Sequence, residues 1–256
     1  IDVDPETGFV TSGRVTDEFL VVRNDLENRE AKLNSFGFNV DYNLSDNWSV
    51  NFDASHSSVE REIWSFESYS GTGRGDNLGV GDSLSYELRP GNSGAIFTPT
   101  LDYSDFNLIQ LGGPRSWGWS SALNEKYGVS DDPIYANTAQ DGFINAPTVD
   151  DELSAFRIAA TQLLDDAGIF TKMQYGASYK TREKEKKSEG YFMTLNAFPN
   201  TLVVPEQYRL GSVSLDFIGM GNMIAYDSGR MLQDGYYDLL AESLTNTSHS
   251  FKSWTV

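Results

Sequence analysis

Two tryptophans in the middle of the chain have the spacing of a ligand-binding aromatic pair. Trp117 and Trp119 are separated by one glycine and follow closely on Arg115. In an extended segment, side chains two residues apart point the same way, so both rings would lie on one side. Aromatic faces stack on the C–H faces of sugars, and nearby Asp and Asn would bind the hydroxyl groups. Arg115, Trp117, Trp119, Trp64 and Tyr69 are therefore candidate ligand-binding residues; the alternative is that these rings only form the core of folded loops.

The chain offers little for catalysis. It has two histidines, His56 and His249, and no cysteine, so it has no thiolate chemistry and no disulfide framework. It contains no sequence typical of zinc proteases, serine hydrolases or phosphate-binding loops. The glycines at 71–75 lack the spacing of a dinucleotide site, and the acidic residues nearby lack the spacing of calcium loops. We therefore expect no catalytic residue, no metal and no cofactor, and a protein that is not an enzyme.

The charge of the chain limits the classes of partner that it can bind. The formal net charge is −18 and the sequence pI is about 4.3. Nucleic-acid binding requires clusters of Lys and Arg, so we expect no nucleic-acid partner. Like-charge repulsion disfavours anionic ligands such as ferric siderophores and is compatible with neutral oligosaccharides. No run approaches the 18 or so apolar residues of a membrane-spanning helix. This leaves a spanning β-barrel open, because each strand of such a barrel is short and half polar.

Two stretches of the chain have the same construction: paired alternating strands joined by a short polar turn. The first hairpin spans about 35–60 and turns at 45–47; the second spans about 153–187 and turns at 165–168. Side chains switch face at every residue of a strand, so each hairpin has one apolar and one small, polar face. The positions expected on the apolar side are Phe36, Phe38, Val40, Tyr42, Leu44, Trp48, Val50, Phe52 and Ala54, then Phe156, Ile158, Ala160, Leu164, Ile169, Thr171, Met173, Tyr175, Ala177 and Tyr179.

Each hairpin runs into a long insert. The inserts span 71–152 and 191–250, and both are rich in glycine and aromatic residues. An insert of this length is too long to be a structureless connection, and its aromatic content favours folding. The spacing of apolar residues predicts a short amphipathic helix over 229–244, and a second candidate helix lies at 121–127.

This pattern is typical of an outer-membrane barrel wall, with its apolar face toward lipid and its polar face toward the lumen. We expect a mainly β fold, with antiparallel hairpins from a transmembrane β-barrel wall, long partly folded loops and one or two short helices. The whole of 1–256 would form a single partial barrel domain, excised from a longer protein. The residues expected to face the lumen are Asn39, Asp41, Asn51, Asp53, Arg157, Lys172 and Gln174.

Residues 32–50 resemble a middle hairpin of a TonB-dependent receptor. Members of that family often carry the pattern G-x-N-x-x-Y-x-L-x-D-x-W-S, which here runs from Gly37 to Ser49. The second hairpin, through the charged run 182–187, resembles the next pair of strands. The resemblance covers about 70 residues directly, and it reaches the inserts only by position and length.

The resemblance implies a 22-stranded barrel with an N-terminal plug in the outer membrane of a Gram-negative bacterium. Such receptors take up a scarce nutrient, here an oligosaccharide or a siderophore-like metal chelate, with energy delivered through TonB. The partners would be outer-membrane lipid, the nutrient ligand, and TonB and the plug in the parent protein. The alternative is a soluble all-β carbohydrate-binding or adhesin module, in which the apolar faces of the two hairpins pack together as a small sandwich.

Overall fold

The computed structural model of the chain is mainly β, and its strands pair antiparallel. It describes residues 1–73, 79–113, 140–164, 168–198, 200–241 and 247–255. The chain divides into two compact units. Unit 1 comprises Ile1–Glu27, Ser65–Asn145 and Gly190–Thr245; unit 2 comprises Asn28–Trp64, Ala146–Glu189 and Asn246–Val256. They subdivide the single partial-barrel domain expected over 1–256, which itself stays a prediction.

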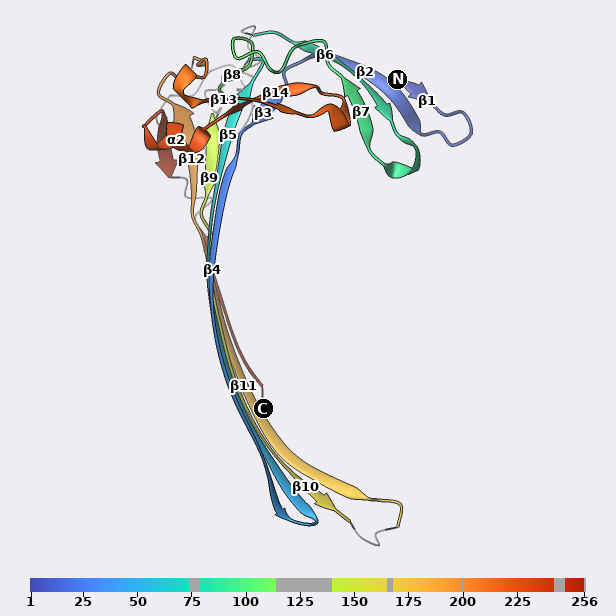
Figure 1. Cartoon of the computed structure of the whole chain (residues 1–256), viewed down its shortest axis with the longest axis vertical. Coiled ribbons are helices and arrows are strands. Elements are labelled where there is room, and N and C mark those ends of the chain that lie inside the picture. Colours follow the sequence, from blue (N-terminus) through green and yellow to red (C-terminus); the bar gives the residue numbers. More distant parts are fainter. Residues whose placement is uncertain (74–78, 114–139, 165–167, 199, 242–246, 256) are drawn as a thin grey trace. The chain divides into compact units, whose positions relative to one another are not determined.

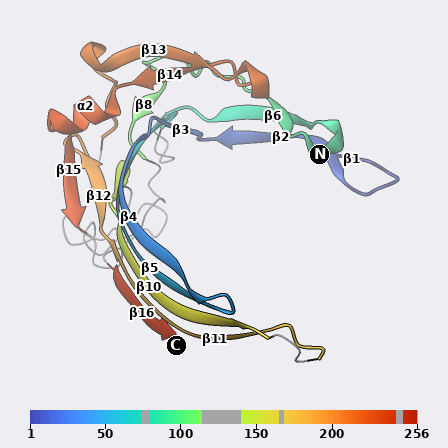
Figure 2. The same cartoon turned by 60° about the horizontal axis from the view of Figure 1, so that its bottom comes forward.

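Unit 2 is one sheet of long strands, which we call the long sheet. Its strands are β4 (Leu26–Ser45), β5 (Trp48–Gly71, through Trp64), β10 (Thr148–Leu163), β11 (Lys172–Ser188) and β16 (Thr247–Thr255). They lie side by side in that order, each antiparallel to the next (Figures 1 and 2). The mainly β, antiparallel fold is therefore confirmed, with hairpin strands longer than predicted; the barrel is not closed by these strands.

The register of the long sheet runs without a bulge from β5 through β10 to β11. Phe52 lies opposite Ile158, which lies opposite Ala177. Directly opposed residues share a face of the sheet, so the residues that point to one face of a strand lie beside those that point to the same face of the next strand. The apolar positions predicted within these strands consequently form one surface. Leu164, Ile169 and Thr171, predicted to belong to the same set, lie in the connection between β10 and β11 instead.

Unit 1 gathers shorter elements from three parts of the chain. β1 (Asp2–Val3), β2 (Val10–Glu18), β6 (Asp82–Leu88) and β7 (Ala95–Thr98) form one sheet in that order. The end of β5 pairs with β3 (Val21–Arg23), β8 (Gln110–Leu111) and β9 (Gly142–Asn145). β12 (Gly190–Leu195) joins β9 to β15 (Tyr237–Ala241), and β13 (Arg209–Ser214) pairs with β14 (Asn222–Tyr226). The helical elements are the turns η1 (Pro90–Asn92), η2 (Glu206–Tyr208) and η3 (Asp216–Ile218) and the helix α2 (Ser228–Gln233).

The two inserts share one core. Every large apolar side chain that is buried among the described residues belongs to unit 1, and Phe66, Ile109, Leu111 and Met193 are wholly inaccessible. A buried carboxylate links the inserts, because Asp141 accepts hydrogen bonds from the backbone N–H groups of Gly113 (3.0 Å) and Leu195 (2.7 Å). The described parts of both inserts therefore fold, as their aromatic content predicted, and they fold together rather than as separate loops.

Two expectations of local structure need correction, the first of them only in the length of the helix. The helix predicted over 229–244 ends at Gln233, since Gly235 adopts a positive φ of 77° and 237–241 pairs with β12 as a strand. The sandwich expected for the alternative fold does not form, because β5 and β10 pair edge to edge and place their apolar residues on the same face. The candidate helix at 121–127 lies outside the described residues.

The confinement of the core to unit 1 predicts a contrast between two methionines. Replacing Met193 with Ala should lower the free energy of unfolding by about 2–5 kcal/mol, because a fully buried side chain leaves a cavity. The matched change Met173→Ala on the exposed apolar face of β11 should cost less than about 1 kcal/mol. Denaturant unfolding in neutral detergent measures both, and equal losses would contradict this assignment of the core.

Candidate functional site

One face of the long sheet is apolar and uncovered. We call it the apolar face; every side chain of its central band is nonpolar, aromatic or Gln162. On β4 the band is strongly exposed, with Phe36 71% and Leu44 60% accessible. Aromatic contacts run along it from strand to strand: Phe38 meets Phe52 edge-on at 6.1 Å, and Phe52 meets Phe156 at 5.0 Å. The band is a continuous surface, and no described residue of unit 2 covers it.

The apolar band has sharp limits. On β5 it runs from Trp48 to Ala54 and gives way to His56; on β11 it runs from Met173 to Tyr179 and gives way to Thr181. At about 3.3 Å per residue, the band is about 20–27 Å long measured along the strands. Aromatic side chains lie at both limits. Trp48 stacks on Tyr175 at one end (6.4 Å between ring centres), and Tyr179 and Trp254 lie near the other.

The opposite face of the same strands, which we call the polar face, is hydrogen-bonded across the strands. Asn39 donates to Asp53 (3.1 Å), Asn51 donates to Asp41 (2.8 Å), and Gln174 donates to Thr161 (3.2 Å). The strand register adds Arg157 opposite Asp53, and Lys172 on β11. The seven side chains expected to face a lumen therefore do share one face of the sheet.

Beyond the apolar band, both faces carry charged side chains. On the polar face Arg182 donates through Nε to Asp151 Oδ1 (2.8 Å) and through its terminal nitrogen to Oδ2, a two-point contact across β10 and β11. On the other face Lys252 pairs with Glu183 at 2.9 Å. The charged run 182–187 thus forms part of a solvated strand end, which is where a wall would leave a bilayer.

The predicted ligand-binding aromatics have different surroundings. Trp64 is half-buried on β5 and lines a pocket of about 200 Å³ in unit 2. Tyr69 is only 4% accessible in unit 1, which favours its alternative role as core. Arg115, Trp117 and Trp119 lie outside the described residues, so their pairing stays a prediction.

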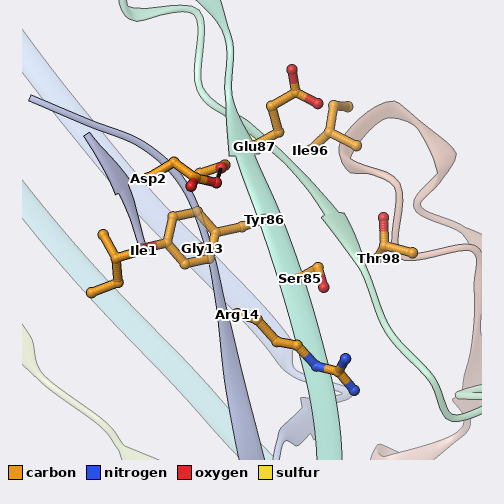
Figure 3. A pocket seen from close by; sticks show the side chains of 10 residues that line it. Ile1, Asp2, Gly13, Arg14, Ser85, Tyr86, Glu87, Ile96 and Thr98 are labelled. Carbon is orange, nitrogen blue, oxygen red and sulfur yellow. Dashed lines mark hydrogen bonds between the residues drawn. The ribbon is translucent and has the colours of Figure 1, made fainter. Parts of the chain in front are cut away.

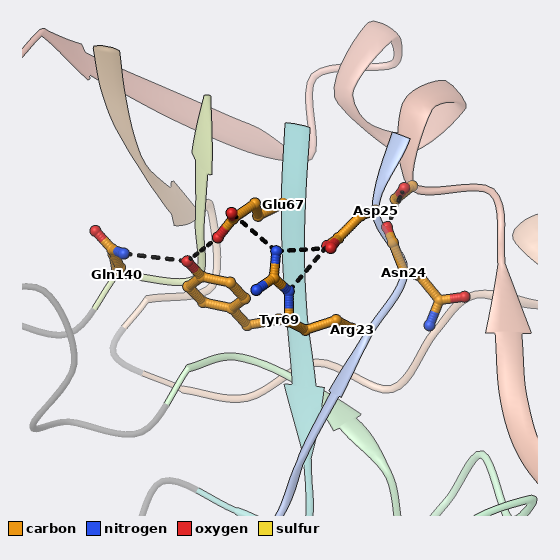
Figure 4. Close-up of polar contacts among 7 residues, drawn as sticks. Arg23, Asn24, Asp25, Glu67, Tyr69 and Gln140 are labelled. Atoms are coloured by element: carbon orange, nitrogen blue, oxygen red, sulfur yellow. Dashed lines mark hydrogen bonds and ion pairs between the residues drawn. The ribbon is translucent and has the colours of Figure 1, made fainter. Parts of the chain in front are cut away.

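Tyr69 belongs to a polar network that the sequence did not indicate (Figure 4). Its hydroxyl donates to Glu67 (2.7 Å) and accepts from Gln140 (3.2 Å). Arg23 joins Glu67 (2.8 Å) to Asp25 (2.6 Å) and lies over the Tyr69 ring. Burial, followed by the bond to Glu67, raises the pKa of the Tyr69 hydroxyl far above its ordinary value. The group therefore stays protonated, and the network ties β3, β5 and the first insert together as a structural element.

Asp82, the first residue of β6, is another buried carboxylate of unit 1. Asp82 is inaccessible and accepts from Thr100 through N (2.9 Å) and Oγ1 (2.7 Å) and from the Tyr103 hydroxyl (2.8 Å). Burial by itself would raise the pKa of Asp82, but these hydrogen bonds outweigh it and hold the pKa below its usual value. The hydroxyl and N–H donors around Asp82 therefore stabilise its ionised form.

A hollow of unit 1 lies on the sheet of β1, β2, β6 and β7 (Figure 3). It measures about 420 Å³ and is lined by Arg14, Ser85, Glu87 and Thr98, among others. The Tyr86 ring lies across Gly13, where any added Cβ would come within 2.6 Å of the hydroxyl. The hollow is open and polar, and its residues form no catalytic arrangement.

Comparison with known proteins assigns no family. Neither the known protein-family models nor the curated proteins contain a match to this chain. Over the residues that the structure describes, no helix has the length and apolar character to span a membrane. The same residues contain no group of three or more His, Cys, Asp or Glu side chains placed to hold a metal ion. The candidate functional surface consists of the two faces of the long sheet described above.

The hydrogen bonds to Asp82 predict a pH dependence of stability. Its folded-state pKa lies below the unfolded value of about 3.9, so its contribution is present above that pH and is lost as pH falls through the folded-state pKa. The variant Asp82→Asn should therefore unfold more readily at neutral pH and lose less stability on acidification than the parent chain. Unfolding at pH 7 and below pH 4 measures this, with Glu87→Gln on the same strand as control; identical pH profiles for parent and Asp82→Asn would refute it.

Proposed function

We propose that the chain is part of an outer-membrane receptor of the TonB-dependent type, which takes up a scarce nutrient, with the long sheet as a section of its barrel wall. The observation that carries the proposal is the continuous apolar face of the long sheet, exposed on one side of strands whose other side is hydrogen-bonded and polar. In water, fully burying a side chain such as Phe or Val gains about 1.5–3 kcal/mol, so such a face needs a nonaqueous cover.

The dimensions of the band fit a bilayer. Transmembrane barrels have an outward apolar band about 25 Å tall, with aromatic residues at both interfaces. Trp48 and Tyr175 at one limit, and Tyr179 and Trp254 at the other, have the amphipathic rings favoured at headgroup level. Tight turns and long connections also fall at opposite ends of these strands, as they do in barrels of this kind.

The inserts supply the part that would meet the nutrient. Both connect strand ends at the same end of the long sheet, and together they supply most of the folded core of unit 1. In a receptor, long connections on the extracellular side provide a ligand-binding surface. A core of this kind would also suit a soluble carbohydrate-binding or adhesin module, but that alternative gives no reason for an uncovered apolar face on strands of this length.

An arginine placed on either face tests the wall assignment. Val40→Arg should reduce the stability of the vesicle-inserted protein by about 2–4 kcal/mol, since the charge would face hydrocarbon near the middle of the band. Asn39→Arg, one residue away on the polar face, should cost little because its guanidinium would face water and Asp53. Denaturant unfolding from lipid vesicles gives both values.

If Asn39→Arg proves as damaging as Val40→Arg, or if neither variant affects insertion, the long sheet is not a membrane wall and the receptor proposal falls with it.

A further inference from the structure

The polar face of the long sheet concentrates positive charge in an acidic chain. Over β5, β10, β11 and β16, seven cationic side chains face this side against two acidic ones, and Asp41 on β4 adds a third acid to the same face. The cations are Arg61, Arg157, Lys172, Lys180, Arg182, Lys184 and Lys186, and the acids are Asp53 and Asp151. Although the chain has a net charge of −18, this face of the long sheet is therefore positively charged.

The apolar face has the reverse balance beyond its band. There, six acidic side chains stand against two lysines on the same four strands. The acids are Glu60, Glu62, Asp150, Glu152, Glu183 and Glu185, and the lysines are Lys187 and Lys252. Because successive side chains of each strand point to opposite faces, the positive side chains gather on the polar face and the negative ones on the other.

The cations of β11 form a regular column. Lys180, Arg182, Lys184 and Lys186 occupy every second position, which spaces their Cα atoms by about 7 Å. Asp151 holds Arg182 by two hydrogen bonds and lies 3.8 Å from Lys184. Lys180 and Lys186 have no ionic partner in the described part of the chain. The single carboxylate of Asp151 can balance one of the four positive charges in this column, so a net charge of three remains.

The surroundings of the column indicate what that could be. On β16, Thr255 and Ser253 lie directly beside Lys180 and Arg182 on this face, and on β10 the neighbours of the column besides Asp151 are the nonpolar Val149, Leu153 and Ala155. Ser55 and Ser57 add two more hydroxyl groups one strand further away, on β5. Hydroxyl groups donate and accept hydrogen bonds to sugar hydroxyls. Sequence-tolerant binding of single-stranded nucleic acid needs aromatic stacking platforms, and Phe251 is the only Phe, Tyr or Trp on this face of the four strands.

We infer that the β11 column binds a linear glycan bearing regularly spaced carboxylate or sulfate groups, with Lys180, Lys184 and Lys186 contacting the anions and the flanking hydroxyl groups contacting the sugars. The inference rests on the proposed function, in which the polar face lines the lumen, and it names the ligand class of that receptor. It replaces the preference for neutral oligosaccharides that the overall charge suggested. Net charge describes the whole surface, whereas a ligand in the lumen would meet only this face.

The test is calorimetric titration of the full chain in neutral detergent with four probes of similar length. Oligogalacturonate carries carboxylates, dextran sulfate carries sulfates alone, dextran is its neutral counterpart, and oligothymidylate is an anion without sugar acids. We expect at least one anionic glycan to bind, with affinity falling as salt rises from about 50 to 500 mM. The glycan that binds identifies the anionic group.

Matched variants locate the binding face. The triple variant Lys180→Gln, Lys184→Gln, Lys186→Gln should weaken binding about tenfold or more, since each exposed ion pair contributes a few-fold. The control Lys187→Gln, Lys252→Gln removes charge from the opposite face of the same strands and should change the affinity less than about twofold.

Three results would overturn the inference: neither anionic glycan binds, the control loses as much affinity as the triple variant, or oligothymidylate or dextran binds as tightly. Failure here is distinguishable from failure of the receptor proposal, because the arginine variants report membrane insertion without any ligand. A chain that inserts but binds no anionic glycan loses only the ligand class.

Discussion

The alternation of side chains along an extended strand is the constraint on which this structure depends. Five antiparallel strands keep a common register, so residues that alternate in sequence are sorted onto two surfaces of opposite character. A shift of one residue in β4 or β5 would bring Asn39 or Asp53 among the phenylalanines. The cross-strand bonds from Asn39 to Asp53 and from Asn51 to Asp41 disfavour that shift, and the contact of Phe38 with Phe52 disfavours it from the other side.

The two units are stabilised by different means. Unit 1 has an ordinary interior in which side chains from both inserts pack, and buried carboxylates such as Asp82 and Asp141 are satisfied by several donors each. In unit 2 the large apolar side chains stay accessible, so backbone pairing and cross-strand contacts hold the sheet. The long sheet therefore depends on its surroundings for the hydrophobic stabilisation that unit 1 provides internally.

The sequence predicts the long sheet well because period two is a local signal that both hairpins repeat. It predicts that the inserts fold but not how, since the partners of Asp141 and the network around Tyr69 come from positions far apart in the chain. The error over 229–244 has the same origin. Leu239 and Leu240 fit a helical spacing locally, yet pairing with β12 makes them strand residues. The charge sorting also escaped prediction, because composition counts Lys and Glu without assigning them to faces.

The most direct test is an accessibility scan of β4 in lipid vesicles. The chain has no native cysteine, so single cysteine substitutions at positions 35–44 can each carry a spin label. Relaxation by oxygen, which partitions into lipid, is then compared with relaxation by a water-soluble nickel complex. Oxygen should dominate at the even positions and nickel at the odd ones, giving an oscillation with a period of two residues. Equal accessibility at both parities, or oxygen maxima at Asn39 and Asp41, would contradict a hydrocarbon-facing wall.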